Sequence, residues 1–270
     1  AYGAALAKAP ANWPRRPEVL VMQIAALAEA EAWPPCAKLA AKAVDATGTA
    51  GSAADFCYWG DKCAGHLTDK AFAKDLRRRL VARIEKVVGD PRAPLSIDDR
   101  SEALRIEREI LLAMGEADAA RKVAERQKTL LDLAAKRAET PAQAMTYNNH
   151  RVDVYLFLGQ GKALVPALRA QVAKLPGAYD PAYRLAQLYA GLDENDAALA
   201  MGKRALGLAY GPRQAGIARF IAGVQHDRGD AAGELAARKE VVKLLLALPE
   251  SQRDPEDLTK ARAALAALTR

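Results

Sequence analysis

The sequence is poor in aromatic residues, which make up 6% of its 270 residues, and it lacks the alternating runs of β-branched residues that mark strands. It has three cysteines and three histidines, and it contains no H-E-x-x-H, no Walker-type phosphate loop and no G-x-S-x-G turn. These absences argue against zinc hydrolases, P-loop enzymes and serine hydrolases. We therefore expect a protein that is not an enzyme, with no catalytic residues, no metal and no cofactor.

The chain also lacks a run of 18 apolar residues and an N-terminal signal peptide. We expect a soluble protein without a membrane span. Both a cytoplasmic and a periplasmic or other extracytoplasmic location remain open, as does the oligomeric state.

A strong excess of charge of one sign is missing too. The net charge is +7, from 40 basic and 33 acidic residues. The densest basic run is Arg77-Arg78-Arg79, and consecutive residues of a helix point in different directions. This pattern favours a solvated helical face, so nucleic acid is an unlikely partner.

Alanine is abundant, with 61 residues, and it is the best helix former. Cap-and-proline starts such as Thr140-Pro141, Asp180-Pro181 and Asp254-Pro255 alternate with Gly or Pro breaks. The sequence therefore predicts an all-α fold of twelve to fourteen helices. Ser52 and the acidic pair Asp193-Glu194 are interpreted as further helix caps.

The predicted turns recur along the chain. Successive tight turns are separated by 34, 48, 44, 34 and 36 residues. They are predicted at Trp33, Leu67, Gly115, Gly159, Asp193 and Gly229. Periods of this size are typical of arrays of antiparallel helical hairpins.

Residues 140–248 resemble the tetratricopeptide repeat (TPR) family. Residues 181–212 carry its small and apolar packing positions, namely Ala182, Leu185, Ala186, Tyr189, Ala198 and Ala205, and residues 149–159 place Tyr155 and Gly159 as a first repeat helix does. The resemblance implies an α–α superhelix, a solenoid of antiparallel helix hairpins. It predicts that Ala186, Ala198 and Ala205 are buried at helix contacts.

On this basis the whole chain, residues 1–270, is interpreted as one helical-repeat array. Residues 1–90 form divergent N-terminal hairpins, residues 97–248 form TPR-like repeats, and residues 254–268 form a C-terminal capping helix. Residues 1–12 read like the second helix of a repeat. We therefore expect a first helix, or another domain, before Ala1 in a longer protein.

The resemblance implies a non-catalytic scaffold that binds a protein or peptide segment on its concave face. The corresponding groove positions are Asn149, Asp153, Leu156, Tyr183, Gln187, Arg219 and His226. Family members that hold a peptide carboxylate use Lys, Asn and Arg there, whereas Asp153 has the opposite charge, so a carboxylate clamp is not expected. The alternative is the helical-repeat region of a larger multidomain protein, which could be an enzyme.

The cysteines allow two interpretations. Cys36 and Cys63 lie at equal distances from the midpoint of a turn near residue 49, so an antiparallel hairpin places them at the same height. They are buried thiols, or, in an oxidising compartment, a disulfide that leaves Cys57 free. Nearby, Phe56, Tyr58 and Trp59 are interpreted as core at a hairpin junction, with a partner-binding pocket as the alternative.

Overall fold

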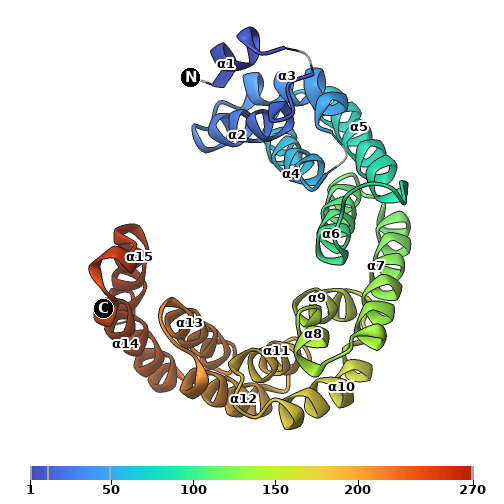
Figure 1. The fold of residues 1–270 in the computed structure, drawn as a ribbon. Helices are drawn as coiled ribbons and strands as arrows, with labels where there is room; N and C mark the ends of the chain where they lie inside the picture. Colours follow the sequence, from blue (N-terminus) through green and yellow to red (C-terminus); the bar gives the residue numbers. More distant parts are fainter. Residues whose placement is uncertain (1, 11, 49, 269–270) are drawn as a thin grey trace. The chain divides into compact units, whose positions relative to one another are not determined.

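The computed structural model describes residues 2–10, 12–48 and 50–268, and every regular element in this part of the chain is a helix (Figure 1). The bounds are α1 (Tyr2–Lys8), α2 (Arg16–Glu29), α3 (Trp33–Ala43), η1 (Val44–Ala46), α4 (Ser52–Gly65), α5 (Lys70–Gly89), α6 (Ile97–Ala113), α7 (Ala117–Arg137), α8 (Pro141–Met145), α9 (Asn148–Phe157), α10 (Gly161–Lys174), α11 (Tyr179–Ala190), α12 (Asn195–Leu208), α13 (Pro212–Asp227), α14 (Ala231–Ala247), η2 (Glu250–Gln252) and α15 (Pro255–Ala266). The all-helical prediction is confirmed.

The described residues contain fifteen α-helices, slightly more than predicted, because the short α8 ends at Met145 before α9 begins at Asn148. None of these helices is both long and apolar enough to cross a bilayer.

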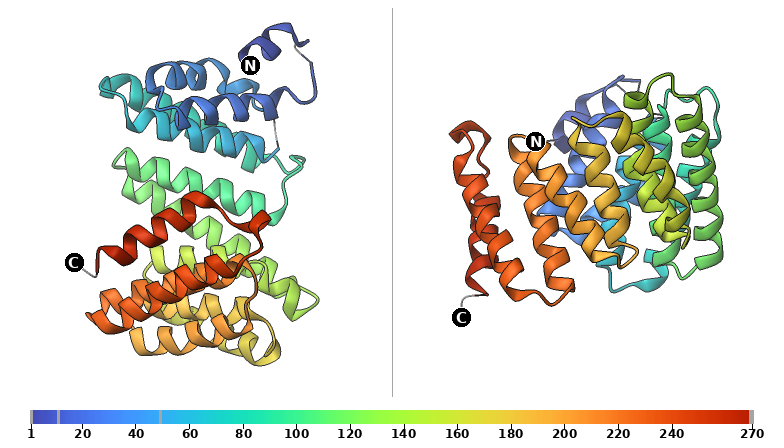
Figure 2. Two further views of the ribbon diagram at one scale, coloured as in Figure 1. Left: turned by 90° about the vertical axis from the view of Figure 1, so that its left-hand side faces the viewer. Right: turned by 90° about the horizontal axis from the view of Figure 1, so that it is seen from below.

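The chain divides into two compact units, unit 1 (Ala1–Ala134) and unit 2 (Ala135–Arg270). Within each unit, successive helices pair antiparallel and lie alongside one another (Figures 1 and 2). In unit 1, α2, α4 and α6 pack together as a first row, and α3, α5 and α7 form a second row. In unit 2, α9, α11 and α13 form the first row, and α10, α12 and α14 form the second row.

Five hairpin turns share one backbone motif. Each has a residue with positive φ, and these residues are Glu31 (54°), Gly115 (80°), Gly159 (70°), Asp193 (61°) and Gly229 (77°). The following residue donates its N–H to the carbonyl five positions earlier, as Glu194 does to Tyr189 over 2.9 Å. This pattern of backbone hydrogen bonds at a helix end is a Schellman motif. It provides N–H donors for carbonyl groups that would otherwise have no hydrogen-bond partner at the helix terminus.

The motif confirms four of the predicted turns and corrects one of them. The turn between α2 and α3 lies at Glu31, and Trp33 is already the first residue of α3. A glutamate with left-handed backbone geometry gives no glycine signal, which explains the error.

The predicted caps are partly right. The side chains of Thr140 and Asp254 accept hydrogen bonds from the first turns of α8 and α15. By contrast, Ser52 is already helical, and the N-cap residues of α11 and α12, Ala178 and Glu194, make no side-chain cap bond. The Schellman turn at Asp193 leads directly into α12 and holds the chain there by backbone bonds.

Small residues allow the helices to approach closely. Ala186, Ala198 and Ala205 are fully buried, as predicted. A Cβ atom added to Gly191 would lie 2.5 Å from Cδ1 of Leu156, so Leu156 packs between the α9–α10 and α11–α12 hairpins. Leu156 is half-buried, so part of its side chain is taken up by this packing.

The predicted C-terminal capping helix, α15, packs on α14. Ala261 is buried against α14 together with Val241 and Leu245, and Leu258 packs on this cluster. Leu268 lies beyond the end of α15 and is exposed.

Candidate functional site: the first-row face of unit 2

Arg184 organises the first-row face of unit 2. It lies on α11, and its Nη1 donates to Oδ1 of Asn149 on α9 over 2.8 Å and to Oε1 of Gln187 over 2.9 Å. Its Nε donates to Oδ1 of Asp180 over 3.1 Å. One guanidinium therefore ties together two neighbouring first-row helices and two of the predicted groove residues.

These bonds also fix the orientation of two carboxamides. Because the side-chain oxygens of Asn149 and Gln187 accept from Arg184, their amide NH₂ groups point away from it. Asn149 is exposed and Gln187 is half-buried. The amide N–H groups of these two residues thus form a pair of donors on the surface of α9 and α11.

An aromatic pair extends this surface towards α13. The ring of Tyr183 lies 5.5 Å from that of Phe220 at an interplanar angle of 87°, an edge-to-face contact. The Arg184 guanidinium lies 5.4 Å from the centre of the Tyr183 ring. Burial raises the pKa of the Tyr183 hydroxyl, with Arg184 opposing the shift.

The carboxylates of this surface differ in environment. Burial raises the pKa of Asp180, and the neighbouring Arg184 opposes this shift. Asp153 lies about one turn beyond Asn149 on α9 and is half-buried.

Arg219 and His226 do not join this surface through any contact that the structure records. Nη2 of Arg219 pairs with Oδ1 of Asp257 on α15 at 2.5 Å, beside a hollow of about 360 Å³ between α13, α14 and α15. Nδ1 of His226 lies 2.9 Å from Oε2 of Glu234, and this contact lowers the pKa of Glu234. Of the predicted groove residues, Asn149, Tyr183 and Gln187 therefore lie around Arg184, whereas Arg219 and His226 contact carboxylates of other helices.

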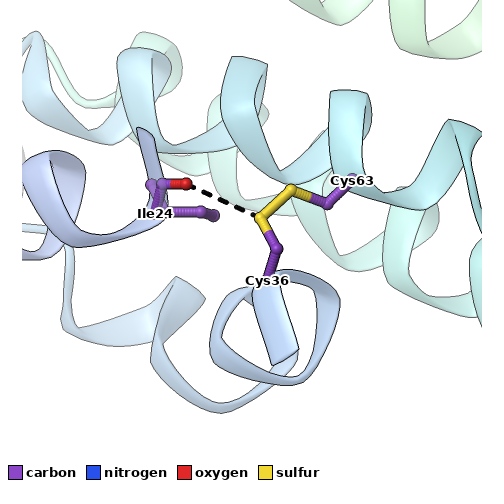
Figure 3. The surroundings of a disulfide bond; sticks show 3 residues. All are labelled: Ile24, Cys36 and Cys63. Carbon is purple, nitrogen blue, oxygen red and sulfur yellow. Dashed lines mark hydrogen bonds between the residues drawn. A yellow bond between two sulfur atoms is a disulfide. The ribbon is translucent and has the colours of Figure 1, made fainter. Parts of the chain in front are cut away.

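The cysteine pair lies in unit 1, in the hairpin of α3 and α4. Cys36 and Cys63 are joined as a disulfide, with their Cα atoms 5.9 Å apart and both residues fully buried (Figure 3). The sulfur of Cys36 also lies 3.6 Å from the carbonyl oxygen of Ile24 on α2. The geometric condition for the pairing, two inward-pointing side chains at the same height, is met.

Cys57 is a buried free thiol. It donates a hydrogen bond to the Leu80 carbonyl over 3.7 Å, and burial raises its pKa to about 12, with Arg83 opposing. A thiol with so high a pKa is a poor nucleophile at neutral pH.

The three aromatic residues of α4 differ in their burial. Phe56 is fully buried and Trp59 packs against the core of unit 1. The side chain of Tyr58 is 41% exposed, so its assignment to the core is wrong. Consecutive helical residues point in different directions, and Tyr58 falls on the first-row surface.

The helical hairpins of this chain are similar to those of solved tetratricopeptide repeat structures. A tetratricopeptide repeat protein from Parabacteroides merdae is 12% identical, aligns over 100% of this chain and 90% of its own, and has a TM-score of 0.52. The fold is tetratricopeptide-like. BtubC from P. vanneervenii is 15% identical over 75% of this chain and 84% of its own, with a TM-score of 0.48.

The C-terminal part of a TPR repeat-containing protein from Cytophaga hutchinsonii is 12% identical over 91% of this chain and 99% of its own, with a TM-score of 0.33. No protein-family model matches the sequence, and no curated protein matches it. Structural similarity at this level of identity shows the TPR-like fold alone.

Sequence reasoning found the rows of TPR-like helices but missed Arg184, Phe220 and Asp257. A signal for Arg184 was present, because Asp180 precedes it by four residues and Gln187 follows it by three, and such pairs lie on one helix face. Phe220 and Asp257 meet their partners across hairpins, so spacing within one helix gives no signal for them.

Proposed function

We propose that the protein is a non-catalytic scaffold that binds an extended segment of another protein on the first-row face of unit 2. The observation that carries the proposal is the bond set of Arg184, which positions the carboxamides of Asn149 and Gln187 as neighbouring donors. Backbone carbonyls of an extended peptide accept hydrogen bonds from such amides. The Tyr183–Phe220 pair beside them offers apolar contact for a side chain.

The dispersal of the titratable groups supports the non-catalytic part of the proposal. Among the residues that the structure describes, no three His, Cys, Asp or Glu side chains are grouped so that they could hold a metal ion. The carboxylates with raised pKa values lie on three different helices, at Asp55, Glu107 and Asp180. A general acid and base would have to lie together on one hollow.

An array of combinatorial twelve-residue peptides, incubated with the full chain, tests the proposal. We expect a subset of peptides to be retained by the wild type. Substitution R184A should weaken that subset roughly tenfold, because it releases both carboxamides. The matched control is K203A, which removes one positive charge from an exposed position of α12 in the second row.

Circular dichroism and thermal unfolding of both variants separate loss of binding from loss of fold. Binding that disappears in the R184A variant but persists in the K203A variant supports the proposal. An array on which no peptide is retained, or an unchanged pattern in the folded R184A variant, would refute it.

A further inference from the structure

The first-row face of unit 1 contains a hollow that the function proposed above does not use. It has a volume of about 280 Å³ and lies between α4 and α6. Its lining combines an aromatic ring, two carboxylates, one ammonium group and two apolar side chains, contributed by Tyr58, Asp61, Glu109, Lys62, Ile106 and Ile110.

Tyr58 is held in place at this hollow. Its ring meets that of Trp59 edge to face, with 5.3 Å between the ring centres, and Lys62 covers the Trp59 ring at 5.0 Å. The other first-row helices of unit 1 also expose a large apolar side chain, Met22 on α2 and Leu112 on α6. Of these three side chains, Tyr58 is the one that lines the hollow, so it offers the apolar contact there.

Carboxylates flank the apolar side chains on α4. Asp61 pairs with Arg77 at 2.6 Å, whereas Asp55 lies one turn before Tyr58 and is exposed. Burial raises the pKa of Asp55, and the carboxylates of Glu102 and Asp99 on α6 raise it further. The negative charge around Asp55 is therefore only partly compensated within the chain.

On α6, two carboxylates share one cation. Arg105 pairs with Glu102 and with Glu109, and the hydrogen bond to Glu102 is the largest cause of a raised Arg105 pKa. Two carboxylates of α6 therefore flank one guanidinium. Leu112 follows Glu109 by three residues and so lies on the same helix face.

The two rows of unit 1 differ in charge. The first-row helices α2, α4 and α6 carry five basic and nine acidic residues. The second-row helices α3 and α5, with α7 up to Ala134, carry thirteen basic and five acidic residues. The chain as a whole has a net charge of +7, so the first row is negative within a positive molecule.

We propose that the first-row face of unit 1 binds a basic, amphipathic segment of a partner protein. An apolar side chain of the segment packs on Tyr58 in the hollow, and its Lys or Arg side chains meet the carboxylates of Asp55, Asp61 and Glu109. Charge complementarity selects this face, because the second row repels a basic segment. The proposal shares the idea of a scaffold with the function above but uses other residues in another unit.

The test uses fluorescence anisotropy of the full chain with a fluorescein-labelled fourteen-residue peptide of Lys and Leu, patterned as an amphipathic helix. A counterpart with Glu in place of Lys reverses its charge, and a scrambled sequence removes its apolar face. We expect the Lys–Leu peptide to bind at least roughly tenfold more tightly than either counterpart, and less tightly as salt is raised.

Variants locate the binding. Substitution Y58A should weaken binding by about tenfold, and Y58F should retain it because the ring is kept. The double substitution D55N with E109Q should weaken binding and flatten its salt dependence. The control D75N removes one exposed carboxylate from α5 in the second row and should leave binding unchanged.

Equal binding of the Lys and Glu peptides, or unchanged binding by the folded Y58A variant, would overturn the proposal. Such a result leaves the peptide array on unit 2 unaffected, so it does not count against the scaffold function. Conversely, an empty array with Tyr58-dependent binding of the basic peptide would refute only the site around Arg184.

Discussion

At the scale of one residue, we expect the ionisation of Glu107 to contribute to the pH dependence of stability. Its side chain is fully buried on α6, and neither of its oxygens accepts a hydrogen bond from the described residues. Burial raises its pKa to about 7; Arg126, 3.8 Å away, opposes this shift, and Glu85 adds to it. A buried carboxyl in this environment is more stable when it is protonated.

The sign of the effect follows from linkage. Because the pKa is raised in the folded state, the folded chain binds the proton more tightly, so stability falls as pH rises from about 4.5 to about 7. The loss is up to about 3 kcal/mol, from 1.4 kcal/mol for each pKa unit. Substitution E107Q should raise the unfolding free energy at pH 8 and leave it nearly unchanged at pH 4.

Urea unfolding of both proteins at pH 4, 6 and 8 checks this prediction. Other titrating groups contribute equally to the two proteins, so their difference isolates Glu107. Two parallel curves of stability against pH would show that folding does not shift the pKa of Glu107.

Glu31 offers a second test at the scale of one residue. A left-handed backbone costs an L-residue about 1–2 kcal/mol, whereas glycine adopts it freely but gains entropy when unfolded. Substitution E31G should therefore stabilise the fold by about 0.5–1 kcal/mol, measured by urea unfolding. The control A26G, at an exposed position inside α2, should destabilise it by about 1 kcal/mol. Destabilisation by both substitutions would contradict the observed φ of 54° at Glu31.

At the scale of helices, the close packing of hairpins depends on small residues. Ala198 on α12 is fully buried, so A198L should overpack its contacts and cost about 1–3 kcal/mol. Ala200 on the same helix is exposed, and A200L should change stability by less than about 0.5 kcal/mol. Equal melting temperatures for the two variants would mean that the hairpin contacts are misassigned.

The α3–α4 hairpin provides a prediction about cysteine chemistry. If the chain folds under oxidising conditions, non-reducing peptide mapping should recover a Cys36–Cys63 link and an unmodified Cys57. Closing a loop with a sequence separation of 27 contributes about 3–4 kcal/mol in the chain-entropy model. Reduction by dithiothreitol should therefore lower the melting temperature clearly. A bridge that includes Cys57, or a melting temperature that does not respond to reduction, would contradict the pairing.

Helix identity and hairpin order could be predicted from the sequence because both depend on local signals. Alanine content, proline after a cap and a glycine at three turns all act within a few residues. The turn at Glu31 and the start of α11 were misplaced, because backbone geometry there does not follow residue type.

At the scale of the molecule, the functional surfaces were harder to predict. Asn149 and Gln187 were found from the repeat frame, but Arg184, which joins them, makes its contact to α9 across 35 residues of sequence. The separation of charge between the rows of unit 1 was also missed. This difference in charge is found only when each helix has been assigned to its row, because the net charge of +7 sums the whole chain.

Binding of a protein segment on the first-row face of unit 2 can be tested by site-specific photocrosslinking in the producing cell. A photoreactive amino acid replaces Gln187 on α11 in one variant and Lys203 on α12 in the other. We expect irradiation to yield discrete covalent adducts with another protein from position 187 and far fewer from position 203. Adducts of equal yield from both positions, or adducts from position 203 alone, would contradict it.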